Sequence, residues 1–242
     1  MKLPVSVVIV ARDEEKVIAE CLRSVEMCAE VIVVVDNRST DETTHIAHDA
    51  GATVFTEKFV DFSQIKNFAL AKAKEPWTLL LDADERVSSE LAESIKKATK
   101  PMQNSPIGFL IAFRNHLRGK WLQHGGMYPD YHLRFFKTKS AHYTGAIHEK
   151  LVIEEGPQGV LGGDIIHMTY PSAKILFRKV RKYAELEAIE YPKKSTSQAV
   201  FHAAKRFIGV YFFRRGILDG INGLINAIAL AEYQYILYKP LS

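Results

Sequence analysis

Mostly apolar and amphipathic segments alternate four times over the first 82 residues, and this alternation constrains the fold more than any other feature. The mostly apolar runs have the length and composition of buried strands: residues 5–10, 31–35, 53–55 and 77–81. Between the first two runs, Val17, Cys21 and Val25 follow helical spacing. Strands that alternate with helices predict an α/β fold with a mostly parallel sheet, right-handed crossovers and helices on both faces.

Polar residues before the helices predict where each helix begins. Asp13 is expected to cap the first helix, and the run from Ser39 to Glu42 has the composition of a capping box for the second. Ser63 is expected to cap the third helix. For Asp13 and Ser39 we expect helix capping to be the main role.

The pattern changes after residue 100. One more amphipathic helix ends at Pro101, and mostly apolar runs without evident helices between them then follow at 107–113, 131–136 and 151–153. We interpret this region as hairpins and loops that build the second half of a cleft. From Ser172 onward the sequence is typical of helices rich in aromatic residues. We therefore expect a helical C-terminal extension over residues 172–242.

The composition is that of an ordinary globular protein, with 47% hydrophobic and 25% charged residues in 242. The N-terminus runs directly into a strand and lacks the apolar segment and cleavage site of a signal peptide. We expect a cytoplasmic protein. Cys21 and Cys28, the only cysteines, are expected to be small core residues and predict neither a disulfide nor a zinc site.

Positive charge is concentrated in the C-terminal segment. Residues 172–242 contain 12 Lys and Arg against 5 Asp and Glu (net +7), whereas residues 1–171 contain 20 against 23 (net −3). Basic pairs such as Lys205-Arg206 and Arg214-Arg215 alternate with aromatic residues, which favours docking on an anionic membrane surface. Alternatively, the aromatic face packs on the preceding α/β domain and the charges are solvated. No recognised motif supports nucleic-acid binding. No apolar run reaches the roughly 18 residues that a membrane-spanning helix needs.

Two carboxylates, Asp82 and Asp84, follow the buried-type strand at 77–81. Ligands of open α/β sheets bind at the carboxyl ends of the strands, and residues two apart in an extended segment share a face. Hard oxygen ligands suit Mg²⁺ or Mn²⁺, which commonly bridge protein carboxylates to substrate phosphates. The alternative is a solvated acidic turn that continues through Glu85 and Arg86.

The first two strands also end in polar residues. Ala11, Arg12 and Glu14 lie after the first strand, and Asp36 ends the second. The Asp36 carboxylate can accept a hydrogen bond from a nucleobase imide or a ribose hydroxyl, and main-chain groups after the first strand can frame the base. No Gly-x-Gly-x-x-Gly or Walker loop occurs, which argues against dinucleotide redox and P-loop chemistry.

Together these motifs resemble the nucleotide-sugar half of inverting family-two glycosyltransferases with the GT-A fold. The resemblance rests on residues 5–14, 34–43 and 79–85. Residues 134–137, 145–149 and 214–220 are similar to the bacterial lipopolysaccharide core β-glucosyltransferases. Family members often carry a second acidic residue after the strand-two Asp, where this chain has Asn37, so Asp36 is the expected base-reading residue.

The resemblance implies a role for each carboxylate. Asp36 would contact the uracil of a UDP-sugar, Asp82 the ribose or donor sugar, and Asp84 the Mg²⁺ or Mn²⁺ on the diphosphate. Lys66 and Arg134 could add positive charge there, and for each the alternative is a solvated surface charge. The resemblance also implies a GT-A domain at 1–171, with a nucleotide-sugar-binding half at 1–100 and an acceptor and catalytic half at 101–171.

An inverting transfer needs a base for the acceptor hydroxyl proton. The resemblance favours Glu149, and Asp130 is the second candidate. His148, beside Glu149, is a candidate substrate contact. His167 is either a metal ligand or donor contact, or a structural histidine.

The predicted protein is a metal-dependent inverting glycosyltransferase, peripheral on the inner face of the cell membrane. It would move a hexose, glucose from UDP-glucose, onto a lipid-linked saccharide such as the lipopolysaccharide inner core. One alternative is a family-two transferase that acts on another glycan or a protein. Another is an inactive nucleotide-sugar-binding scaffold, which the retention of both Asp82 and Asp84 disfavours.

Overall fold

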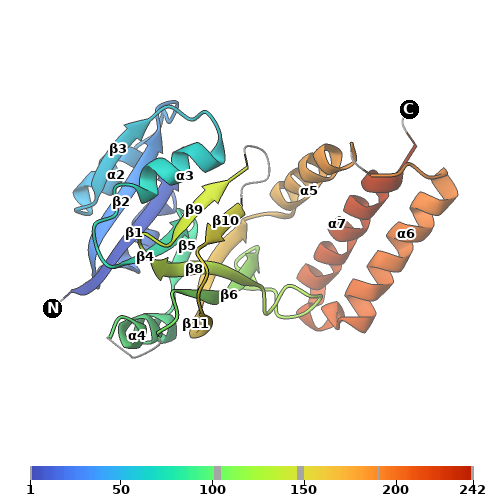
Figure 1. The fold of residues 1–242 in the computed structure, drawn as a ribbon. Coiled ribbons are helices and arrows are strands. Elements are labelled where there is room, and N and C mark those ends of the chain that lie inside the picture. Colours follow the sequence, from blue (N-terminus) through green and yellow to red (C-terminus); the bar gives the residue numbers. More distant parts are fainter. Residues whose placement is uncertain (1, 101–104, 146–149, 190, 241–242) are drawn as a thin grey trace. The chain divides into compact units, whose positions relative to one another are not determined.

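The computed structural model describes residues 2–100, 105–145, 150–189 and 191–240 (Figure 1). They form two compact units. The first unit comprises Met1–Phe113 and Tyr131–His167, and the second comprises Arg114–Asp130 and Met168–Ser242. The functional division into halves at residues 100 and 171 stays a prediction.

The first unit begins with the predicted strand–helix alternation. The strands are β1 (Leu3–Ala11), β2 (Cys28–Asp36), β3 (Thr53–Glu57) and β4 (Trp77–Asp82), and they pair in parallel in the order β3-β2-β1-β4. The helices between them are α1 (Ile18–Arg23), α2 (Thr43–Asp49) and α3 (Phe62–Leu70). The alternation predicted over the first 82 residues is therefore confirmed.

The same sheet continues beyond β4 with strands that the chain contributes later. They follow in the order β8 (Tyr131–Lys137), β6 (Gly108–Leu117), β11 (Gln158–Tyr170) and β5 (Glu85–Val87), and β7 (Lys120–Trp121) pairs with β6. β8 is antiparallel to both β4 and β6, and β5 is antiparallel to β11. β9 (Ala141–Thr144) and β10 (Lys150–Ile153) form a separate antiparallel pair. The parallel part thus carries an antiparallel extension.

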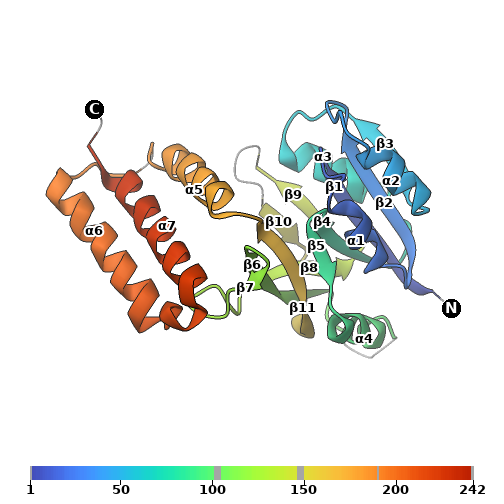
Figure 2. The same cartoon turned by 180° about the vertical axis from the view of Figure 1, so that it is seen from behind.

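Helices cover both faces of the sheet (Figures 1 and 2). Successive residues of β1 point to opposite faces. Val7 and Ile9 belong to one core together with Ile18 of α1 and residues of α2 and of α4 (Ser89–Ala98). Val8 belongs to a second core with Ile65 of α3. The predicted α/β fold is confirmed, and Cys21 and Cys28 are free and buried in the first core, as expected.

The predicted cap of α3 is wrong by two residues. The helix begins at Phe62, and the side chain of Asp61 accepts the Gln64 amide hydrogen bond at 2.8 Å. Ser63 lies inside the first turn, is buried, and donates its hydroxyl hydrogen to the Gly145 carbonyl oxygen. An Asp is as good an N-cap as a Ser, and here it takes the position before the first turn.

Gly163 in β11 lies where a side chain cannot fit. Its φ is +83°, and a Cβ there would be 2.2 Å from the backbone nitrogen of Leu91 in α4. We expect Gly163→Ala to lower the free energy of unfolding by about 2 kcal/mol or more, because backbone strain and a steric clash each cost about 1–3 kcal/mol. Chemical denaturation measures this value.

The neighbouring Gly162 provides the matched control. A Cβ there would meet only the Ser94 hydroxyl, at 3.4 Å, and the backbone needs no positive φ. Gly162→Ala should therefore stay within about 0.5 kcal/mol of the native protein. Equal stability of the two variants would contradict the close approach of β11 to α4.

The second unit is mainly helical. It contains α5 (Ala173–Glu187), α6 (Thr196–Ile208), the π-helical turn η1 (Gly209–Phe213), the 3₁₀ turn η2 (Gly216–Asp219) and α7 (Gly220–Tyr238). Ser172 caps α5, so the helical segment begins where the sequence predicted it. Leu122, Leu176 and Ala229 belong to the core of this unit. Within the described residues, no helix combines the length and apolar character that a membrane span requires.

Candidate functional site

The carboxyl ends of β1, β2 and β4 meet at one edge of the sheet. Ala11 lies opposite Val35 in the register, directly before Asp36, and Val10 lies opposite Asp82. The parallel pairing therefore brings the ends of three strands, and the polar residues that follow them, side by side. This is the edge at which open α/β sheets bind ligands.

Asp36 is a buried carboxylate held by arginine. Asp36 is only 3% exposed. Arg38 donates from Nε to Oδ1 at 3.0 Å and from Nη2 to Oδ2 at 2.6 Å, and its amide donates to Oδ1 at 3.0 Å. Arg12 Nη1 lies 3.8 Å from Oδ2. These hydrogen bonds, first among them those from the Arg38 side chain, lower the pKa of Asp36 although burial opposes the charge. Asp36 is thus an ionised acceptor with a fixed orientation.

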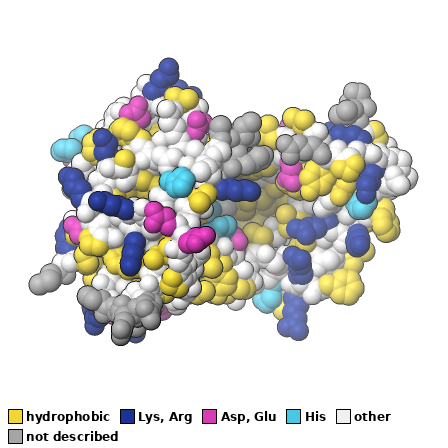
Figure 3. Space-filling view, in the orientation of Figure 1, with side chains coloured by type: hydrophobic (Ala, Val, Ile, Leu, Met, Phe, Trp, Pro, Cys, Tyr) yellow, Lys and Arg dark blue, Asp and Glu magenta, His cyan; other side chains and the backbone are white. Residues whose placement is uncertain are grey.

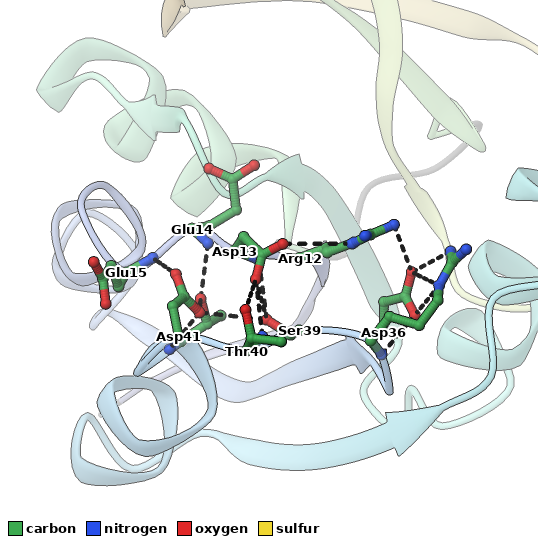
Figure 4. A network of polar contacts seen from close by, with 10 residues as sticks. Arg12, Asp13, Glu14, Glu15, Asp36, Ser39, Thr40 and Asp41 are labelled. Carbon is green, nitrogen blue, oxygen red and sulfur yellow. Dashed lines mark hydrogen bonds and ion pairs between the residues drawn. The ribbon is translucent and has the colours of Figure 1, made fainter.

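Asp13 and Ser39 join the loops after β1 and β2 and cap no helix, so both predicted caps are wrong (Figure 4). The Asp13 amide donates to Ser39 Oγ at 3.0 Å, and the Thr40 amide donates to Asp13 Oδ1 at 2.9 Å. Asp13 has a left-handed backbone with φ +54°. Short polar side chains satisfy backbone groups in such turns as readily as at helix ends.

A second set of hydrogen bonds fixes Glu14 and Glu15, which follow Asp13 in the loop after β1. The Glu14 amide donates to Thr43 Oγ1 at 2.8 Å, and the Glu15 amide donates to Asp41 Oδ2 at 2.9 Å. The predicted capping box is absent, since α2 begins at Thr43 and the Thr43 amide donates to Asp41 Oδ1 at 3.0 Å. The Glu14 carboxylate points away from this network (Figure 4). The loop backbone is thereby held in one position.

Arg134 links two carboxylates at the end of β4. Its Nη2 donates to Glu85 Oε1 at 3.0 Å and to Asp82 Oδ2 at 3.3 Å. Glu85 is fully buried and also accepts the Asp82 amide hydrogen bond at 2.9 Å. The guanidinium lies over the Phe113 ring, 5.1 Å from its centroid. Arg134 therefore fixes the orientation of Asp82 from β8, a strand more than 50 residues later in the chain.

The two carboxylates respond to this environment in opposite ways. Desolvation opposes the charge of Asp82, but the positive charges of Arg134 and Lys66 outweigh it and lower the pKa of Asp82 to about 2. Burial raises the pKa of Glu85, and the nearby Asp82 charge adds to this effect. Lys66 also lies over the Tyr143 ring, 4.9 Å from its centroid. Lys66 and Arg134 thus favour the ionised form of Asp82, and their contact with the donor diphosphate stays a prediction.

Asp84 lies beside His167, with 3.5 Å between Asp84 Oδ2 and His167 Nε2. The antiparallel pairing of β5 with β11 brings them together, because Glu85 lies opposite His167. No group of three or more Asp, Glu, His or Cys that could hold a metal occurs among the described residues. The pair nevertheless fits Mg²⁺ or Mn²⁺. Such ions often bind one or two carboxylates and complete their coordination shell with substrate phosphates and water, and they accept imidazole less commonly.

The family model for glycosyl transferase family 2 matches residues 6–155, which include the ends of β1, β2 and β4. The chain belongs to glycosyl transferase family 2. It is 28% identical over 246 residues to the lipopolysaccharide core biosynthesis glycosyltransferase LpsC of Rhizobium meliloti, covering 97% of this chain and 90% of LpsC. It is 27% identical to an uncharacterized glycosyltransferase of Rickettsia typhi, covering 96% of this chain and 84% of that protein.

Two solved structures are also similar to the chain. Staphylococcus aureus TarS in complex with UDP-GlcNAc is 15% identical, with a TM-score of 0.46 over 97% of this chain and 82% of that one. Glucosyl-3-phosphoglycerate synthase from Mycobacterium tuberculosis, in complex with Mn²⁺, UDP and phosphoglyceric acid, is 15% identical, with a TM-score of 0.46 over 75% and 76%.

Of the two candidate bases of this family-2 glycosyltransferase, the structure describes Asp130 but not Glu149. Asp130 lies in the second unit, is partly buried, and accepts a hydrogen bond from Asn115 Nδ2 at 3.3 Å. Glu149 and the neighbouring His148 lie outside the described residues. Their roles stay predictions.

Glu85 is the residue of this transferase site that the sequence did not single out. The interpretation of residues 82–86 as a solvated acidic turn is wrong, since Glu85 is fully buried and Arg86 forms an ion pair with Glu20. A signal for this burial was present in the sequence: Glu85 and Val87 lie two residues apart, and they share a face in the short strand β5. An acidic residue buried at a site requires a partner, and Arg134 is that partner.

Proposed function

We propose that this family-2 glycosyltransferase is an inverting, metal-dependent enzyme that transfers glucose from UDP-glucose to a lipid-linked saccharide such as the lipopolysaccharide inner core. The observation that carries the proposal is the gathering of Asp36, Asp82 and Asp84 at one edge of the sheet. The name of LpsC, a relative over almost the whole chain, supports the class of acceptor.

Asp36 would bind the uracil of the donor. A carboxylate has about four lone-pair positions, so Asp36 can accept an imide N–H and keep hydrogen bonds from Arg38. The backbone of Ala11 and Arg12 would frame the base, held in place by the bonded loop that follows. The Glu14 carboxylate points away from that bonded loop and would contact the ligand in this proposal.

Asp82, Asp84 and His167 would surround the ribose and the diphosphate. Asp82, held by Arg134, would accept a hydrogen bond from a sugar hydroxyl. Asp84 and His167 would hold a divalent cation, which neutralises charge on the departing diphosphate. Lys66 adds positive charge on the same side as Asp82, and Arg134 acts by orienting Asp82.

Inversion requires a base on the side of the donor sugar away from the leaving group. We assign this role to Glu149, and Asp130 is the second candidate. The base removes the acceptor hydroxyl proton as the new glycosidic bond forms and the bond to the diphosphate breaks.

Two substitutions should separate donor binding from chemistry. Asp36→Ala should weaken UDP affinity about tenfold or more, because it removes a contact made in both the ground and transition states. Glu149→Gln should leave UDP affinity within about twofold of native but reduce transfer by about 10²-fold or more, because only proton removal is lost. Calorimetry with UDP and an assay of transfer measure the two effects.

Asp49→Ala provides the control for charge, because Asp49 is an exposed residue of α2. Asp49→Ala should change neither the UDP affinity nor the rate of transfer. Near-native transfer by Glu149→Gln would reject Glu149 as the base and move the assignment to Asp130. Native UDP affinity in Asp36→Ala would contradict the proposed orientation of the donor.

The proposed location is the inner face of the cell membrane, with the basic second unit turned to anionic lipid. Its net positive charge and exposed aromatic side chains support this location.

A further inference from the structure

An open pocket of about 290 Å³ lies within the second unit, lined by residues of α6, η1 and α7. Its volume lies just below the usual range of small-molecule sites, about 300–1,000 Å³. Lys205, Arg206 and Arg214 supply its cations, and His202 and Gln234 supply further polar groups. No Asp or Glu among the described residues lines it. A pocket of this composition favours an anion.

The cations of the pocket lack counter-ions within the described residues. None of the three forms an ion pair there. The carboxylates of the neighbouring elements are engaged elsewhere, since Asp219 accepts from His124 at 2.8 Å and Glu232 accepts from Arg181 at 2.7 Å. Partial burial, and then the charge of Arg214, lower the pKa of Arg206. An anion between the two guanidinium groups would relieve this repulsion.

The loop before Asp130 holds Arg214 in position. The Gly125 amide donates to the Arg214 carbonyl oxygen at 2.8 Å. Gly126 has φ +81°, and a Cβ there would lie 2.6 Å from Arg214 Nη1. The guanidinium therefore lies against the Gly126 backbone. An arginine that is already ordered loses less conformational entropy when it binds an anion.

Exposed apolar side chains follow the pocket along the chain. Phe213 in η1 is 83% exposed and Leu218 in η2 is 64% exposed, and Phe212 and Ile221 are also exposed. Figure 3 shows Lys and Arg side chains beside hydrophobic side chains over the second unit. Basic and aromatic residues next to one another suit the headgroup region of a bilayer, where apolar side chains enter the acyl boundary.

We propose that the pocket of Lys205, Arg206 and Arg214 binds the phosphate of an anionic lipid headgroup, while Phe212, Phe213 and Leu218 enter the bilayer surface. This inference rests on the proposed membrane location and adds a specific headgroup site to it. Arginine suits the role because its planar fork matches phosphate oxygens.

The test is sedimentation of the full chain with vesicles of phosphatidylcholine, with and without phosphatidylglycerol. The native protein should bind the anionic vesicles, and Lys205→Gln with Arg206→Gln should bind about thirtyfold more weakly, since each cation at an anionic surface contributes about fivefold. Arg178→Gln with Lys182→Gln removes the same charge from the exposed side of α5 and should change binding by less than about fivefold. Circular dichroism must first show that both variants are folded. Arg206→Lys alone should bind better than the double variant but less tightly than the native protein, because it keeps the charge and loses the planar fork.

Each outcome has a distinct meaning. Equal losses in the two double variants would show diffuse attraction and overturn the pocket, leaving the membrane location intact. Native protein that stays in the supernatant at low salt would overturn the pocket as a lipid site together with the membrane location. Vesicle binding by the pocket variant at the native level, with loss of glycerol phosphate binding in calorimetry, would overturn the lipid assignment in favour of a soluble phosphate. None of these results bears on UDP release with a soluble acceptor, which tests the transferase reaction separately.

Discussion

Replacing Arg134 with methionine should lower the free energy of unfolding by about 3–5 kcal/mol, the usual cost of removing one partner from a buried ion pair. The reason is Glu85, which is fully buried and, among the residues that the structure describes, contacts a cationic side chain only at Arg134, at 3.0 Å. Asp82 contributes less to this loss, because its side chain is 43% exposed and water can replace the guanidinium. Urea denaturation followed by circular dichroism measures the change.

A second substitution tests the cause. Glu85→Gln in the Arg134→Met background removes the uncompensated charge while keeping an oxygen for the Asp82 amide. The double variant should regain at least about half of the lost stability. If Arg134→Met alone is as stable as the native protein, or if the second change restores nothing, the buried pair of Glu85 and Arg134 does not stabilise the fold as proposed.

Asp84→Ala should reduce the rate of transfer by about 10²–10³-fold, the usual effect of removing a contact that stabilises charge in the transition state. A chelator should have a similar effect on the native protein. Calorimetry with Mn²⁺ in the presence of UDP gives a second measurement, since the variant should bind the ion more weakly.

Glu93→Ala is the control, because Glu93 is an exposed carboxylate on α4 of the same unit. It should retain both transfer and Mn²⁺ affinity. Full activity of the native protein in excess chelator would reject metal dependence.

The four parallel strands could be predicted from the sequence because each is a mostly apolar run bounded by polar residues. Their parallel pairing also fixes which residues meet, so the convergence of Asp36 and Asp82 followed from the order of the elements. Burial on both faces leaves a strong pattern in the sequence.

The strand β11 could not be predicted, because Gly159, Gly162, Gly163 and Asp164 interrupt its pattern with residues that are rare in strands. The positive φ of Gly163 and its close approach to α4 explain why the glycine is there. That contact depends on tertiary structure and has no local signal.

The errors at Asp13 and Ser39 have a similar origin. Asp and Ser satisfy backbone N–H groups both at helix starts and between loops, and only the approach of two loops decides between these uses.

The burial of Glu85 depends on Arg134, which lies 49 residues away. Local pattern identifies the residue types of this site, whereas long-range pairing determines their partners.

The most direct test of the proposed reaction is release of nucleoside diphosphate from a panel of nucleotide sugars, with Mn²⁺ and a deacylated lipopolysaccharide core as acceptor. We predict that UDP-glucose is consumed faster than UDP-sugars with other hexoses and faster than GDP- or ADP-sugars, and that Asp36→Ala and Asp84→Ala both reduce UDP release. No consumption of any nucleotide sugar, or preferred consumption of a donor that lacks uracil, would contradict the assignment of this edge as a UDP-glucose site.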